Sequence, residues 1–175
     1  MRSTADYSLL EEALQEVYQG LTETFPPAIP PDLTYLLEDY PRNPLFDLLA
    51  GKGWNEVYEG GKYRDFDGSF HYLWPEDFLY YLPLALLILF PGNRFGEEGE
   101  YLSGTHVLRS IVSILSESRD ILQASLSPMQ TRAVEDVLER CIAFDSHVAF
   151  CGYYSYSDFL RAYSDLVHAW FGADV

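Results

Sequence analysis

Four histidines and two cysteines are the residues of this chain best suited to metal binding or nucleophilic catalysis. An acid and a histidine stand three residues apart at Asp165 and His168, which is the spacing that a di-iron helix bundle uses. Such a site also needs a second motif of this kind, which the sequence does not supply. Cys141 and Cys151 form no CxxC pair, and no Cys/His cluster has zinc spacing. We therefore expect neither a metal nor another cofactor.

Asp145, Ser146 and His147 are the three residue types of a hydrolase triad. A triad is assembled in space by distant segments, so the adjacency of these residues argues against one. The sequence also lacks a G-x-S-x-G elbow, a GxGxxG loop and a complete P-loop. Among 27 acids, any carboxylate pair chosen for glycoside hydrolysis would be uninformative. The sequence favours a protein without catalytic residues over an enzyme.

The helices that would position any site surround one apolar stretch, residues 78–90, which reads FLYYLPLALLILF. A helix that is apolar on every side lies inside a protein, and a membrane span would need about 20 such residues. We predict a buried central helix over residues 76–90. Pro83 should kink or split it, because proline removes one helical hydrogen bond.

Helical periodicity and capping signals place amphipathic helices on both sides of this stretch. Apolar residues recur at helical spacing in residues 10–21, 102–115, 134–142 and 160–170. Pro44 and Pro128 stand where a helix would begin, the position that proline favours. Four prolines in residues 26–31 favour a stiff extended connector.

Residues 62–72 differ from the rest, because they alternate partly between apolar and polar side chains. With the turn dipeptide Asp67-Gly68 they favour a minor β-hairpin, and an ordered loop is the alternative. With that exception the pattern predicts an all-α fold, a compact helical bundle that forms one domain over residues 1–175.

The net charge of −16 is the strongest global signal. Residues 1–50, 51–100 and 101–175 each carry nine acids, against two, four and five bases. Acidity spread in this way repels nucleic-acid phosphates and anionic membranes and attracts basic proteins. The early apolar positions are interleaved with acids, which is not a signal-peptide pattern, so we expect a cytoplasmic protein with reduced thiols.

Two groups of residues are candidates for binding. The first is an aromatic run at a loop-to-helix junction, a typical interface composition, although these rings could instead fill the gap between the last two helices. It consists of Tyr153, Tyr154, Tyr156 and Phe159. The second is a pocket beside Pro83, where a kink would free backbone carbonyls. Its candidate lining residues are Tyr80, Tyr81 and His106.

A resemblance covers about half of the chain, mainly residues 54–138. Trp54 and the segment Phe70-x-x-Leu73-x-Pro75-Glu76-Asp77-Phe78-x-Tyr80-Tyr81-Leu82-Pro83 resemble a small bacterial family of unknown function, whose members carry an "edF-YYLP" segment that enters an apolar helix. Its later "Ls--Q--av--fL" helix is similar to residues 126–138, where Val137-Leu138 replaces the usual aromatic-Leu pair. The resemblance implies an α-helical fold and brings no established catalytic residues. In size and charge the chain also resembles immunity proteins of bacterial toxin systems.

Three functions follow as hypotheses. The first is a non-enzymatic cytoplasmic domain that binds a basic protein, such as an immunity or antitoxin-like inhibitor. The second is a small-molecule binder or enzyme with its pocket beside Pro83. The third is a homodimer built on the tyrosine-rich run.

Overall fold

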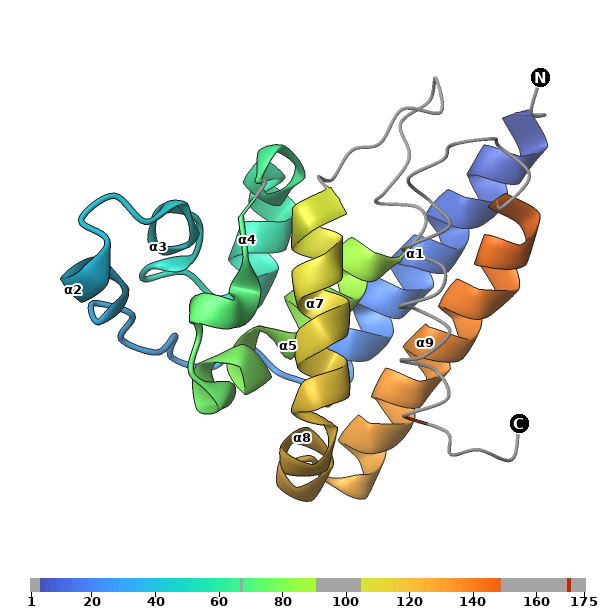
Figure 1. The fold of residues 1–175 in the computed structure, drawn as a ribbon. Coiled ribbons are helices and arrows are strands. Elements are labelled where there is room, and N and C mark those ends of the chain that lie inside the picture. The colour runs from blue at the N-terminus through green and yellow to red at the C-terminus, as the bar shows by residue number, and fades with distance from the viewer. Residues whose placement is uncertain (1–3, 67, 91–104, 149–169, 171–175) are drawn as a thin grey trace.

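The computed structural model describes residues 4–66, 68–90, 105–148 and 170, and its helices enclose the predicted central stretch (Figure 1). The α-helices are α1 Thr4–Thr24, α2 Leu36–Asp39, α3 Pro44–Leu49, α4 Trp54–Gly60, α5 Pro75–Leu89, α7 Thr105–Glu117, α8 Arg119–Ser125 and α9 Pro128–Val148. Two short 3₁₀ helices, η1 Lys62–Asp65 and η2 Phe70–Tyr72, connect α4 to α5. The predicted all-α class is confirmed.

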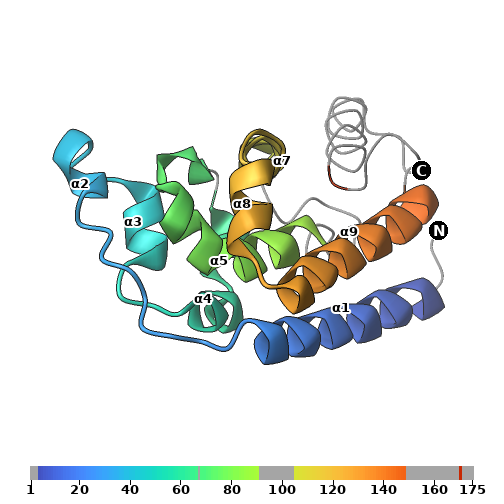
Figure 2. The same ribbon diagram turned by 90° about the horizontal axis from the view of Figure 1, so that it is seen from below.

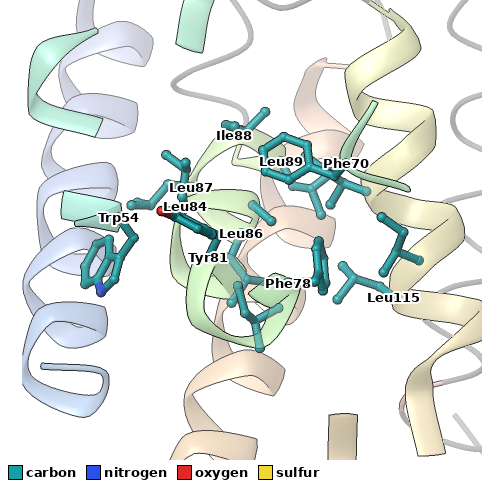
Figure 3. Close-up of a cluster of buried hydrophobic side chains, with 14 of the residues drawn as sticks. Trp54, Phe70, Phe78, Tyr81, Leu84, Leu86, Leu87, Ile88, Leu89 and Leu115 are labelled. Atoms are coloured by element: carbon teal, nitrogen blue, oxygen red, sulfur yellow. The ribbon is translucent and has the colours of Figure 1, made fainter. Parts of the chain in front are cut away.

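The central helix α5 begins with Pro75 in its first turn and contacts α1, α4, α7, α8 and α9. From Tyr81 to Phe90 every residue is buried. The leucines of this half lie among aromatic rings and aliphatic side chains from α4, η2 and α7, including Trp54, Phe70 and Leu115 (Figure 3). Full burial of one such leucine stabilises the fold by about 1.5–3 kcal/mol. Because α5 runs through Pro83 without a break, proline does not split this helix.

Helices α1 and α9 lie side by side and run in opposite directions (Figure 2). Arg140 of α9 joins them, because its guanidinium lies 2.9 Å from the Glu16 carboxylate of α1 and 3.0 Å from that of Asp136. Ion pairs as exposed as these contribute about 0.2–1 kcal/mol. The burial of Val17 and Leu21 from α1 with Val134 and Leu138 from α9 therefore holds the two helices to the core.

The hairpin predicted near residues 62–72 is wrong, because the described residues there form η1 and η2. Tyr63, Phe66 and Phe70 are all buried, and they recur at intervals of three and four residues. That spacing suits helical turns, whereas an extended strand would place Tyr63 and Phe66 on opposite faces. The Phe66 and Phe70 rings meet edge to face at 5.9 Å, so burial of these rings outweighed the local turn signal.

Candidate binding site at the start of the central helix

Helix α5 begins at a point where aromatic and acidic side chains meet solvent. Trp74 precedes the helix with extended backbone and is 59 % exposed. Pro75 follows at the first helical position, and Glu76 and Asp77 lie in the first turn. Carboxylates are favoured there because the helix dipole is positive at its N-terminus. The same arrangement places two negative charges beside a large, accessible indole.

The Trp74 ring stacks on Tyr35, with ring centroids 4.1 Å apart and planes inclined by 8°. The Tyr35 hydroxyl donates to Asp77 Oδ2 at 2.7 Å and accepts from the backbone amide of Trp74 at 3.2 Å. These two hydrogen bonds tie the Tyr35 hydroxyl to Asp77 in the first turn of α5 and to the residue that precedes the helix. The Trp74 indole therefore stacks on a phenol ring that is held in place.

Two further exposed tyrosines stand on the same two segments of chain, five residues after Tyr35 and two residues before Trp74. Tyr40 and Tyr72 meet edge to face with centroids 5.8 Å apart, and they are 56 % and 49 % exposed. We call these two tyrosines, with the Tyr35–Trp74 stack, the aromatic platform. Exposed aromatic rings in this number are typical of sites that contact other molecules.

A cleft of about 420 Å³ opens at the same end of α5. One wall is the start of the proline-rich connector, which contributes Phe25, Pro26 and Ala28. Two hydrogen bonds fix this wall, because Trp54 Nε1 donates to the Phe25 carbonyl at 3.1 Å and the Tyr80 hydroxyl donates to the Ala28 carbonyl at 2.7 Å. The connector is thereby attached to both α4 and α5.

The facing wall of the cleft comes from the junction of α8 and α9, through Ser125, Leu126 and Gln130. The side chain of Gln130 accepts from the Ser127 amide at 3.0 Å, and the Ser127 hydroxyl accepts from the Gln130 amide at 3.2 Å. This reciprocal capping box fixes the start of α9. Helix α5 supplies Glu76, Leu79 and Tyr80, and α4 supplies Trp54.

Carboxylates create a negative potential at this end of α5, and this potential adds to burial in raising the pKa of nearby tyrosines. Burial, followed by the hydrogen bond to Asp77, raises the pKa of Tyr35, and the charge of Glu76 adds to the shift. Burial and then the charge of Glu56 raise the pKa of Tyr80. Among the described residues, neither Glu76 nor Asp77 forms an ion pair with lysine or arginine. The negative charge is therefore not neutralised within this part of the chain.

The residues predicted to line a pocket beside Pro83 are placed in three different settings. Tyr80 lines the cleft, next to Tyr81, whose ring lies 4.8 Å away. Tyr81 itself is fully buried, and its hydroxyl bonds to the carbonyls of Leu49 and Lys52. His106 is exposed on α7 and does not line the cleft. The tyrosine-rich run with Tyr153, Tyr154, Tyr156 and Phe159 lies outside the described residues.

The aromatic platform was not among the residues singled out from the sequence. The local signal for it is the Trp-Pro dipeptide at residues 74–75, because proline at the first helical position leaves the preceding tryptophan outside the helix. The stacking partner, Tyr35, stands 39 residues earlier in the chain, and no local pattern connects the two.

In comparisons with protein-family models, curated proteins and solved structures, nothing matches this chain. Within the described residues, His, Cys, Asp and Glu form no group of three or more that could hold a metal ion. The helices in that part of the chain include none that is long and apolar enough to cross a membrane.

Proposed function

We propose that this chain is a cytoplasmic protein-binding domain that recognises a basic partner through the aromatic platform and the carboxylates beside it. The observation that carries the proposal is the Tyr35–Trp74 stack, which exposes much of an indole that is ordered by stacking on a hydrogen-bonded phenol ring. Tryptophan and tyrosine dominate the binding energy of many protein interfaces. A ring that is already ordered loses little conformational entropy when a partner covers it.

The aromatic and acidic side chains of this surface favour contact with a cationic side chain of a partner. A lysine or arginine side chain that stacks on Trp74 would gain a cation–π attraction of about 0.5–2 kcal/mol. The carboxylates of Glu76 and Asp77, which have no cationic partner among the described residues, would add charge-assisted hydrogen bonds. The net charge of −16 would accelerate the encounter with a basic protein more than it would tighten the complex.

An inhibitor that covers a basic toxin, as an immunity protein does, is one form that this function would take. A second copy of this chain is a poorer fit, because two molecules that each carry a charge of −16 repel one another. Light scattering in low and high salt would test the dimer. Self-association that weakens as salt is removed would agree with this repulsion, whereas a dimer that persists in low salt would contradict it.

The experiment compares the wild type with Trp74→Ala as immobilised baits in a host lysate at low salt. Leu9→Ala is the matched control, since Leu9 is 59 % exposed on α1 and belongs to neither the platform nor the cleft. A captured basic protein is then purified and its Kd is measured. We expect Trp74→Ala to weaken binding by at least about tenfold, the effect of losing a central aromatic contact. Leu9→Ala should bind like the wild type.

Two outcomes would contradict the proposal. A partner that binds Trp74→Ala as tightly as the wild type would place the contact elsewhere on the molecule. An association rate that does not fall as salt is added would remove the electrostatic part of the argument, because screening weakens steering between exposed charges.

A further inference from the structure

The cleft has the size and lining of a ligand site. None of the residues of the aromatic platform lines it. Its volume of about 420 Å³ lies within the range of roughly 300–1,000 Å³ that small-molecule sites occupy. Phe25, Trp54, Leu79 and Leu126 make much of its lining apolar. An apolar lining with few polar groups is the usual composition of a site for an organic molecule.

The polar side chains of the lining are mostly occupied by the protein itself. The Tyr80 hydroxyl and Trp54 Nε1 donate to carbonyls of the connector. The Ser125 hydroxyl donates to the Ile121 carbonyl at 2.8 Å, and Gln130 Oε1 accepts from the Ser127 amide. These hydrogen bonds hold the walls in place and occupy the donor hydrogens of Trp54, Tyr80 and Ser125.

Glu76 is the one charged residue among the described residues that line the cleft. Within the described part of the chain its carboxylate has no hydrogen bond or ion pair to a protein group. Glu56, whose carboxylate accepts from the Gly53 amide at 2.6 Å, adds to the negative potential at Tyr80. An anionic ligand would be repelled here, and a cation would be attracted.

We propose that the cleft binds an organic cation, with an apolar body against Pro26, Leu79 and Leu126 and an ammonium or guanidinium group at the Glu76 carboxylate. The cleft is preformed, because hydrogen bonds fix both the connector wall and the α8–α9 wall. The cation can be a free amine or the side chain of a lysine or arginine in a partner. The inference shares the Glu76 carboxylate with the proposed function, but Trp74, the residue that carries the proposed function, does not line the cleft.

The test is isothermal titration of the whole chain with three probes of similar shape: 2-phenylethylammonium, the neutral 2-phenylethanol and the anionic 3-phenylpropanoate. We expect the cation to bind at least about tenfold more tightly than the alcohol, which is what a hydrogen bond to a charged group contributes. The anion should not bind measurably. Equal affinity for the cation and the alcohol would overturn the proposal, because it would show that Glu76 does not recognise the charge.

Two variants locate the site. Glu76→Gln keeps the size of the side chain and removes the charge, so the cation should then bind no better than the alcohol. Glu23→Gln is the matched control, since Glu23 is an exposed acid of α1 outside the cleft. Amide resonances of Leu79, Tyr80 and Gln130 should shift as the cation is added. Unchanged binding by Glu76→Gln, or shifts confined to other residues, would place the cation elsewhere and overturn the proposal.

A fourth probe separates the two sources of the cation. Nα-acetyl-lysine methylamide presents a lysine side chain without its protein. Tighter binding of this probe than of 2-phenylethylammonium would favour a side chain of a partner, and the reverse order would favour a free amine. Trp74→Ala should bind both probes like the wild type. A loss of partner binding in this variant would therefore concern the proposed function and not the cation site.

Discussion

The two halves of helix α5 have different surroundings. From Tyr81 onward every residue is buried, and the hydroxyl of Tyr81 is the only polar side-chain group. In the other half Glu76 is exposed, Asp77 and Tyr80 are half-buried, and Trp74 precedes the helix with 59 % of its surface exposed. One continuous helix therefore supplies both the centre of the core and the surface at which the platform and the cleft meet.

This difference separates stability from recognition along a single element. Loss of buried apolar contacts lowers the free energy of unfolding, whereas loss of an exposed ring mostly changes what a partner can contact. Substitutions in the buried half should therefore mainly lower the free energy of unfolding, and substitutions at the exposed half should mainly lower the affinity for a partner.

Leu86→Ala should have the largest effect on stability. Leu86 is fully buried, and its truncation leaves a cavity, so we expect the free energy of unfolding to fall by about 2–5 kcal/mol. Trp74→Ala should cost only about 0.5–1.5 kcal/mol, through loss of its stacking on Tyr35. Urea unfolding of both variants measures the difference. Equal losses would show that the two halves do not differ in this way.

Tyr81→Phe should have the next largest effect. The Tyr81 hydroxyl lies 3.1 Å from the Leu49 carbonyl and 3.0 Å from that of Lys52, and its removal leaves the buried side of these groups without this donor. We expect a loss of about 1–3 kcal/mol in urea unfolding. Partner binding should be unaffected, and a binding defect as large as that of Trp74→Ala would contradict the separation.

Tyr35→Phe makes the same chemical change beside the exposed half of α5, where the Tyr35 hydroxyl bonds to Asp77, and it should cost less stability. Water can replace the lost hydroxyl at the Asp77 carboxylate, so we expect about 0.5–1.5 kcal/mol. Partner affinity should fall as well, because the phenol ring that supports Trp74 is held less firmly. The comparison with Tyr81→Phe sharpens the contrast, since one deleted hydroxyl belongs to the buried half of α5 and the other bonds to its exposed half.

Alkaline pH should produce the smallest effect. Burial raises the pKa of Tyr81 above its ordinary value of 10.0, so the protonated phenol stabilises the folded state. That contribution is complete below pH 10 and is lost as the pH rises further, because the unfolded chain ionises first. The stability advantage of the wild type over Tyr81→Phe should therefore be constant below pH 10 and should shrink above it. An advantage that grows with pH would contradict the sign of this shift.

Local sequence signals were sufficient to predict the central helix and the start of α9. The apolar stretch at residues 78–90 has no polar face to expose, so its burial follows from composition. Ser127 and Pro128 carry their own capping signal within one turn. The hairpin prediction was wrong because it rested on a local turn dipeptide. The structure there is instead determined by tertiary packing, which buries three aromatic rings.

The aromatic platform and the cleft could not be predicted in the same way. The two rings of the stack are 39 residues apart in the sequence. The cleft needs the connector, α4, α5 and the α8–α9 junction in their final positions. Periodicity indicates which face of a helix is buried, but it does not indicate which distant segment covers that face.

The distribution of the three tryptophans has a spectroscopic consequence. Trp54 and Trp170 are 1 % and 4 % exposed, whereas Trp74 is 59 % exposed. Only an indole in contact with water emits at the red edge of the fluorescence spectrum and is readily quenched by acrylamide. The quenchable, red-shifted emission of the folded chain therefore comes from Trp74, and the protein carries its own optical reporter for occupancy of the platform.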